Sequence, residues 1–248
     1  MTERATNYAI IAGSGFESFA TDAASRRVDT PFGTPSAGIR QITYGTCKVS
    51  YLARHGEGRH IPAHRVNYRA NLAALAGLGV SDVLAVNTVG VIRPGLEPGT
   101  LAVPAQLIDY TYGRDHSIYD ENSATLDHVD FTRPFCDALR AGLLQAGRTA
   151  GAACFDGGVY AVTQGPRLES AAEIDRLERD GADFVGMTLM PEAAIARELC
   201  MRFACLSLLV NHAAGRSEKG IYEDIETSME SARQQALRVL QAFFGNLP

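Results

Sequence analysis

Residues 10–16 read Ile10-Ile11-Ala12-Gly13-Ser14-Gly15-Phe16, an apolar run that ends in a turn of small residues. The run over 8–12 predicts a short β-strand that is apolar on both faces, as in a sheet covered by helices on both sides. Glycines in the turn let a ligand approach the backbone closely, although the motif alone also fits an ordinary tight turn. Further strands are predicted over 49–53, 83–87, 101–103, 158–162, 184–185 and 205–210.

Helical patterns alternate with these strands. Apolar stripes at helical spacing occur over 66–78, 135–144, 171–177, 191–199 and 221–244. This alternation predicts an α/β fold: a single domain over 1–248 with a twisted mixed β-sheet flanked by helices. In such a sheet, ligand-binding residues lie in loops at the carboxyl ends of the strands.

The composition is that of an ordinary globular protein. The 248 residues are 46% hydrophobic and 21% charged, with a formal net charge of -5. These values exclude a mainly disordered chain, a collagen-like chain and a coiled coil. The acidic balance disfavours nucleic acid and anionic membrane as partners. No signal-peptide pattern and no apolar stretch of about 20 residues occurs, so we expect a cytoplasmic protein.

The cysteine and histidine positions indicate neither disulfides nor a metal site. The five cysteines are odd in number and form no C-x-x-C pair, so we expect reduced, buried thiols. His55, His60 and His64 match no zinc spacing, and no carboxylate or cysteine completes a ligand set. We therefore predict no metal site.

Polar residues follow several predicted strands. Arg54 and His55 come directly after the strand over 49–53. A guanidinium can hold a phosphate through its planar fork of donors, although a surface Arg–His pair is the alternative. Asn87 either caps its strand or forms one wall of an anion site. Thr188 is either a phosphate ligand or a hydroxyl near a helix N-cap.

Three later positions are ambiguous when each is considered alone. Glu169 follows the turn Gly165-Pro166-Arg167 and could be only a first-turn carboxylate favoured by the helix macrodipole. Met187 is either a core residue or a soft platform beneath a sugar. Asn211 ends the last predicted strand on an amide.

In their order along the chain, these residues resemble the trimeric purine nucleoside phosphorylase and methylthioadenosine phosphorylase family. The resemblance covers essentially the whole chain. The matching motifs are Gly13-Ser14-Gly15, Arg54-His55-Gly56, Val66-Asn67-Tyr68-Arg69-Ala70-Asn71, Asn87 to Gly90, Gln106-Leu107-Ile108-Asp109, Gly165-Pro166-Arg167, Met187-Thr188 and Pro191-Glu192. It implies a nucleoside phosphorylase-type fold and cleavage of a purine nucleoside by inorganic phosphate as co-substrate. It implies no metal or organic cofactor, and a homotrimer or a dimer of trimers.

The resemblance also assigns expected roles. Phosphate is expected to meet Ser14, Arg54, His55, Thr88 and Thr188, with Asn87 as a further wall of that site. Met187 matches the residue that packs on the ribose. The catalytic residues are expected to be Asn211, Glu169 and His55, around a phosphate held under the anomeric carbon.

Asn211 and Glu169 together match the base-reading pair of the 6-oxopurine phosphorylases. Methylthioadenosine phosphorylases typically carry Asp at the first position and a second Asp where this chain has Ala213. Glu169 can accept from purine N1–H, and the Asn211 amide can donate to O6 or N7. Because adenine presents an acceptor at N1, a 6-oxopurine is expected. Leu168 stands where the family usually stacks Phe on the base.

The expected 5′ pocket is apolar. His128 matches a residue that reaches into a neighbouring subunit's 5′ pocket, and Tyr222 and Ile225 match the other wall. An apolar wall favours a methylthio group, so the expected substrate is S-methyl-5′-thioinosine, cleaved to hypoxanthine and 5-methylthioribose 1-phosphate. The Tyr222 phenol could instead bond a 5′-hydroxyl. A general inosine/guanosine phosphorylase therefore stays open. A non-catalytic nucleoside-binding module also stays open. His212 has no assigned role.

Overall fold

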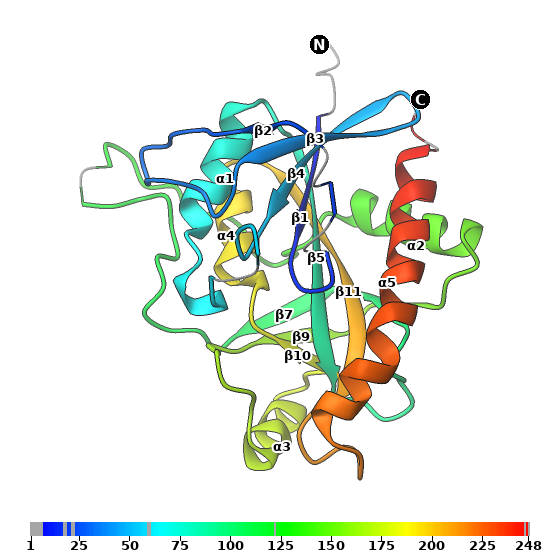
Figure 1. The fold of residues 1–248 in the computed structure, drawn as a ribbon. Helices are drawn as coiled ribbons and strands as arrows, with labels where there is room; N and C mark the ends of the chain where they lie inside the picture. Colours follow the sequence, from blue (N-terminus) through cyan, green and yellow to red (C-terminus); the bar gives the residue numbers. More distant parts are fainter. Residues whose placement is uncertain are drawn as a thin grey trace.

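One mixed sheet runs through the chain (Figure 1). The computed structural model describes residues 7–16, 19–20, 23–58, 61–121, 123–245 and 247. Its strands are β1 Tyr8–Ala12, β2 Ser25–Arg26, β3 Ile39–Tyr44, β4 Cys47–Ala53, β5 Asp82–Val91, β6 Leu101–Val103, β7 Gln106–Asp109, β8 Cys154–Asp156, β9 Val159–Val162, β10 Phe184–Gly186 and β11 Arg202–His212. They lie in the order β2-β3-β4-β1-β5-β10-β9-β7. Strand β11 pairs with β5 and β6, and β8 pairs with β6.

Helices cover the sheet on both sides. They are the 3-10 turn η1 Ala63–Arg65 and the α-helices α1 Tyr68–Gly77, α2 Asp137–Thr149, α3 Ala171–Arg179, α4 Leu189–Glu198 and α5 Ile221–Gly245. Figure 1 shows α1 and α4 on one side of the central strands and α2 and α5 on the other. The predicted α/β class with a mixed sheet is confirmed. Among the described residues, no helix has both the length and the apolar content to cross a membrane.

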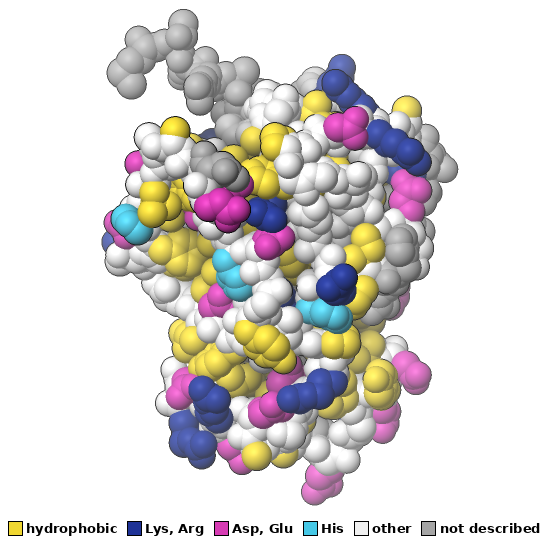
Figure 2. All heavy atoms as spheres, turned by 90° about the vertical axis from the view of Figure 1, so that its left-hand side faces the viewer, with side chains coloured by type: hydrophobic (Ala, Val, Ile, Leu, Met, Phe, Trp, Pro, Cys, Tyr) yellow, Lys and Arg dark blue, Asp and Glu magenta, His cyan; other side chains and the backbone are white. Residues whose placement is uncertain are grey.

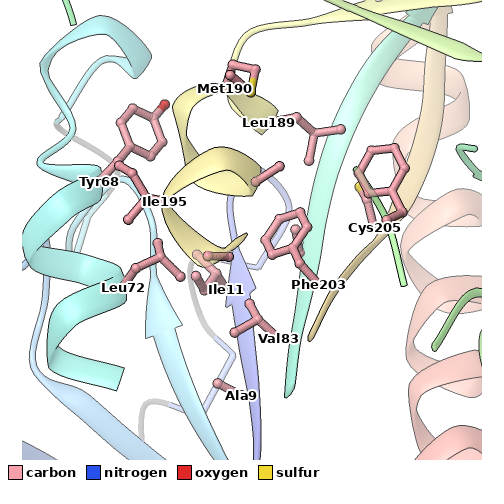
Figure 3. Close-up of a cluster of buried hydrophobic side chains, with 14 of the residues drawn as sticks. Ala9, Ile11, Tyr68, Leu72, Val83, Leu189, Met190, Ile195, Phe203 and Cys205 are labelled. Carbon is pink, nitrogen blue, oxygen red and sulfur yellow. The ribbon is translucent and has the colours of Figure 1, made fainter. Parts of the chain in front are cut away.

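Two hydrophobic clusters fill the two faces of the sheet. Ile11 of β1 belongs to the cluster beside α1 and α4, together with Leu72 and Ile195 (Figure 3). Its neighbour Ile10 belongs to the other cluster, together with Val239 of α5. Both isoleucines are fully buried, which stabilises the fold by about 1.5–3 kcal/mol for each such side chain. The apolar run therefore correctly predicts a strand covered on both faces.

Strands β5 and β11 are longer than predicted. Asn87 pairs with Ser207 in the middle of the parallel ladder, and Asn211 pairs with Gly90 near its end. A polar side chain interrupts the apolar pattern without interrupting the ladder, because the backbone makes the hydrogen bonds. Asn87 is therefore an interior strand residue, and its interpretation as a strand-end cap is wrong. A bulge between Leu209 and Asn211 shifts the register just before the amide.

The cysteines form no disulfide. Cys205 is buried, and its burial raises the pKa of the thiol to about 12. Cys47, Cys136 and Cys154 are half-buried and Cys200 is exposed, contrary to the expectation of buried thiols. Cys200 lies in the turn after α4.

Candidate active site

A cavity of about 480 Å³ opens at the carboxyl ends of the central strands. Strands β4, β1, β5 and β11 are parallel neighbours, so the residues that follow them meet at one edge of the sheet. The volume is that of a small-molecule site. Every predicted site residue except one lines it: Ser14, Arg54, His55, Asn87, Thr88, Leu168, Glu169, Met187, Thr188, Asn211, Tyr222 and Ile225.

His128 is the exception. It is exposed, in the segment between β7 and α2, and does not line the cavity of its own chain. Its expected contribution to a neighbouring subunit's pocket stays a prediction.

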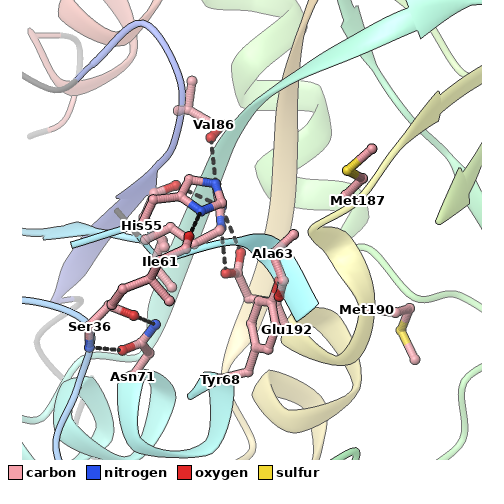
Figure 4. A network of polar contacts seen from close by, with 12 residues as sticks. Ser36, His55, Ile61, Ala63, Tyr68, Asn71, Val86, Met187, Met190 and Glu192 are labelled. Atoms are coloured by element: carbon pink, nitrogen blue, oxygen red, sulfur yellow. Dashed lines mark hydrogen bonds and ion pairs between the residues drawn. The ribbon is translucent and has the colours of Figure 1, made fainter. Parts of the chain in front are cut away.

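Arg54 is fully buried at the base of the cavity. Its Nε and Nη2 donate to the two carboxylate oxygens of Glu192, each at 2.8 Å, and Figure 4 shows Glu192 in this network. Nη2 also donates to Ile11 O and Nη1 to Val86 O, both at 3.0 Å. Burial opposes the charged form, but the Glu192 carboxylate raises the pKa of Arg54 above its ordinary value. The planar fork therefore faces Glu192, and one Nη1–H is left for a ligand.

His55 lies beside this arginine. Its Nδ1 is 2.8 Å from Ile61 O (Figure 4), and a carbonyl oxygen can only accept, so Nδ1 carries a hydrogen. A Cβ at Gly13 would lie 3.0 Å from Arg54 Nη1 and 3.2 Å from His55 Nε2. The turn after β1 can pack this closely against both side chains because residue 13 is glycine.

Two buried polar atoms at the cavity have no hydrogen-bond partner among the residues that the structure describes. Asn87 Oδ1 accepts a hydrogen bond from Ser207 Oγ at 3.0 Å. Asn87 Nδ2 and Thr188 Oγ1 are buried and make no hydrogen bond to the part of the chain that the structure describes. A buried polar group without a partner costs about 1–3 kcal/mol, so these two atoms favour a polar occupant.

Glu169 is held by a hydroxyl. Thr163 Oγ1 donates to Glu169 Oε1 at 2.6 Å. The carboxylate that caps α3 is a different one: Ser170 is the N-cap, and its backbone N–H donates to Glu173 Oε2 at 2.8 Å in a capping box. Hydrogen bonds from Arg167 and the Ser170 backbone lower the pKa of Glu173 to about 2. Glu169 precedes the N-cap, so its interpretation as only a first-turn carboxylate of α3 is wrong, and it lines the cavity instead.

Asn211 is nearly buried, with 7% of its surface exposed. Its Nδ2 donates to His212 O at 2.7 Å, which leaves Oδ1 and one N–H for a ligand. His212 donates its backbone N–H to Asp224 Oδ2, and its Nδ1 lies 3.0 Å from the same oxygen. Burial opposes ionisation of Asp224, but these hydrogen bonds lower its pKa. His212 thus ties the end of β11 to the start of α5.

Helix α5 closes the far end of the cavity. Tyr222 and Ile225 line it as expected, and Met229 lies one turn further along the same helix face. A Cβ at Gly15 would lie 3.2 Å from Met229 Sδ, so α5 packs directly on the turn after β1. The helical stripe identifies Met229 as inward-facing, but it carries no sign that the residue reaches a site. Tyr222 is 73% exposed and stands at the rim.

No group of three His, Cys, Asp or Glu side chains among the described residues could hold a metal ion. His60, part of the histidine pattern considered above, lies outside the described residues.

Comparisons with known proteins agree with this architecture. The model of the phosphorylase superfamily matches residues 7–245. A probable S-methyl-5′-thioinosine phosphorylase from Pseudomonas syringae pv. tomato is 46% identical over 96% of this chain and 99% of its own. A 6-oxopurine nucleoside phosphorylase from Pyrococcus furiosus is 37% identical over 97% of this chain and 92% of its own.

The solved structures place the fold in the same group. Methylthioadenosine phosphorylase from Schistosoma mansoni, crystallised with adenine, superposes with a TM-score of 0.89 at 30% identity, covering 97% of this chain and 91% of the other. The expected nucleoside phosphorylase-type fold is confirmed. A family match along nearly the whole chain, relatives well above 30% identity and a shared fold lead to one conclusion: this chain belongs to the phosphorylase superfamily.

Proposed function

We propose that this protein is a pentosyltransferase that cleaves S-methyl-5′-thioinosine with inorganic phosphate, giving hypoxanthine and 5-methylthioribose 1-phosphate. The observation that carries the proposal is the pairing of a carboxylate, Glu169, and an amide, Asn211, in the cavity that also contains Arg54. The relative from Pseudomonas syringae supports the substrate.

Phosphate is proposed to bind at the strand-end side of the cavity. The remaining Arg54 Nη1–H, Asn87 Nδ2 and Thr188 Oγ1 offer hydrogen-bonding capacity that the described protein leaves unused. Phosphate oxygens would satisfy these groups, with Ser14, His55 and Thr88 completing the site.

The base is proposed to lie between Glu169 and Asn211. Glu169, oriented by Thr163, would accept from N1–H of a 6-oxopurine. The second N–H of Asn211 Nδ2 would donate to O6 or N7, and its Oδ1 would accept a hydrogen bond from a protonated ring nitrogen of the departing base. An adenine ring would set its N1 lone pair against the Glu169 carboxylate, which is the basis of the proposed selectivity.

In the reaction, the C1′–N9 bond breaks with its electron pair going to the purine. A phosphate oxygen forms the new bond to C1′, and the phosphate proton ends on the base. Negative charge on phosphate stabilises the oxocarbenium-like sugar, while the Asn211 amide stabilises charge on the leaving base. Met187 would pack on the ribose, and Ile225 and Met229 would form the apolar wall for the methylthio group.

A substrate panel tests the proposal. kcat/KM is measured for S-methyl-5′-thioinosine, inosine and S-methyl-5′-thioadenosine with and without phosphate, by release of the free base. We expect phosphate-dependent cleavage with methylthioinosine preferred. Preference for methylthioadenosine would overturn the proposed roles of Asn211 and Glu169. No base release in the presence of phosphate would support a non-catalytic nucleoside-binding module instead.

A general 6-oxopurine phosphorylase is the second candidate. The Tyr222 phenol lines the cavity at its rim, where it could bond a 5′-hydroxyl, and the Pyrococcus furiosus relative carries that activity in its name. Preference for inosine in the same panel would favour it.

We further propose that the site is completed in a homotrimer. The segment that carries His128 also exposes Tyr112 and Leu126, at 71% and 61%. This segment runs along the left of Figure 1, the side that faces the viewer in Figure 2, where hydrophobic side chains gather between mixed charges. In a mixed trimer, a subunit that keeps Glu169 can receive His128 from its neighbour. Mixing the His128→Ala and Glu169→Gln proteins should therefore give more activity than either variant has alone. Full activity in a monomer would refute the trimer.

A further inference from the structure

Arg114 lies outside the cavity but contacts both sides of it. The residue follows β7, and its partly buried side chain does not line the cavity. Its guanidinium lies over the ring of Tyr68 in α1, 5.7 Å from the centroid, and Nη1 donates to the Tyr68 hydroxyl at 3.5 Å. Tyr68 in turn donates to Ala63 O, at the cavity wall.

All three nitrogens of this guanidinium are hydrogen-bonded. Nη1 donates to Met187 O at 2.9 Å and to Met190 O at 2.6 Å. Nη2 donates to Thr163 O at 3.2 Å and to Gln164 O at 2.8 Å, and Nε donates to Gln164 Oε1 at 3.1 Å. One side chain therefore satisfies backbone carbonyls from two separate segments.

Those two segments diverge where the sheet ends. Strands β9 and β10 pair in parallel as far as Val162 and Gly186, and Thr163 N donates to Gly186 O as a last backbone bond. Beyond this point no ladder fixes their spacing, and buried carbonyls need other donors. Here the planar guanidinium of Arg114 donates to carbonyls of both segments and so fixes their spacing in place of the ladder. The segments also touch, since a Cβ at Gly165 would lie 2.5 Å from Met187 Sδ.

We propose that Arg114 is a positioning residue that sets the Glu169 carboxylate at a fixed distance from Met187 and Thr188. One segment carries Glu169 through the Thr163 hydroxyl, and the other carries the proposed ribose and phosphate contacts. Arg114 thus aligns the base with the sugar and the attacking phosphate. The proposal rests on the proposed function, because it concerns the geometry of that reaction.

The variants Arg114→Lys and Arg114→Ala test it against the matched control Arg140→Lys. Arg140 also donates to two backbone carbonyls, of Val103 and Pro104, and to Asp156, and its side chain is 15% exposed, but it is remote from the cavity lining. A lysine keeps the charge but lacks the fork. We expect Arg114→Lys to lose about 100-fold in kcat/KM, because misplacement of about 1 Å costs that much. KM for both phosphate and nucleoside should rise. Arg140→Lys should lower the melting temperature and leave both KM values unchanged.

Chemical rescue separates positioning from folding. Millimolar guanidinium added to Arg114→Ala should restore part of the lost kcat/KM, and sodium at equal ionic strength should not. If Arg114→Lys and Arg114→Ala are folded and keep wild-type kcat and KM, the proposal fails. The variants could instead lose activity only because a smaller fraction of the protein is folded and active. Both KM values would then be unchanged and guanidinium would give no rescue; in that case Arg114 is structural and the proposal also fails. A wild-type protein without phosphorolysis would overturn the proposed function instead.

Discussion

The two ends of the cavity are built in different ways. At the phosphate end, Arg54 is buried among strand backbones, and its Nε and Nη2 donate to a buried carboxylate. At the base end, Glu169 stands on a loop, held by one hydroxyl, and Leu168 beside it is 39% exposed. The comparison teaches that the arginine proposed to bind the anion is fixed by buried contacts within the fold. Of the two residues proposed to select the base, Asn211 stands on β11, whereas Glu169 stands on a loop that the sheet does not restrain.

The largest expected effect is at the phosphate end. Glu192→Gln leaves the Arg54 charge buried without its counter-charge, and removing one partner of such a pair costs about 3–5 kcal/mol. The free energy of unfolding, from urea denaturation, measures it. The control is Glu57→Gln in the exposed pair with Arg40, where the loss should be about 0–1 kcal/mol. Equal losses in the two variants would contradict the view that the Arg54–Glu192 pair is a buried part of the fold.

The next largest expected effect is a loss of catalytic activity from a change at the base end. Glu169→Gln replaces the proposed acceptor for N1–H with an amide. Loss of a charged hydrogen bond of about 1.5–3 kcal/mol predicts a decrease of about 10- to 150-fold in kcat/KM for methylthioinosine. Stability should change little. Glu173→Gln, four residues along, is the control and should keep the wild-type kcat/KM. A Glu169→Gln enzyme as active as wild type would show that another group binds the base.

Asn211→Asp should alter preference more than total activity. An aspartate oxygen would face His212 O across the 2.7 Å now spanned by a hydrogen bond, so the two oxygens repel unless the carboxyl is protonated. We expect the ratio of kcat/KM for methylthioadenosine to that for methylthioinosine to rise about tenfold. Activity should also decrease as pH rises and the new carboxyl ionises. An unchanged ratio and a wild-type pH profile would remove Asn211 from the base site.

The smallest expected effect is on the melting temperature, through Glu173 beside the loop that carries Glu169. The pKa of Glu173 is lowered to about 2 in the folded protein, so its stabilisation is present above its unfolded pKa of about 4.3 and is lost as pH falls toward 2. The melting temperatures of wild type and Glu173→Gln should therefore differ at pH 6 and converge near pH 2. A constant difference would mean that the carboxylate does not bond Arg167 and Ser170 in solution.

Much of this architecture follows from short-range sequence patterns. The apolar runs identify β1, β4 and β6 almost to the residue, and the stripe over 221–244 identifies α5. Strands β2, β3, β7 and β8 are not predicted. In β7, for example, no residue is fully buried, so it lacks the apolar signal of a covered strand.

The site, too, can be predicted from the sequence only in part. Its lining residues are predictable because polar side chains follow apolar strands whose ends meet at one edge. The partners of those residues are not, because they are distant in sequence: Glu192 is 138 residues from Arg54, and Arg114 is 76 residues from Met190. No local pattern marks which carboxylate an arginine will meet.

The capping of α3 has a consequence for how this family can diversify. Because Ser170 and Glu173 complete the helix start between themselves, residue 169 carries no structural duty there. Substitutions at 169 can therefore accumulate without weakening the domain. If Glu169 binds the base as proposed, a single replacement at this position would alter the purine preference and leave the Arg54–Glu192 pair at the phosphate end intact.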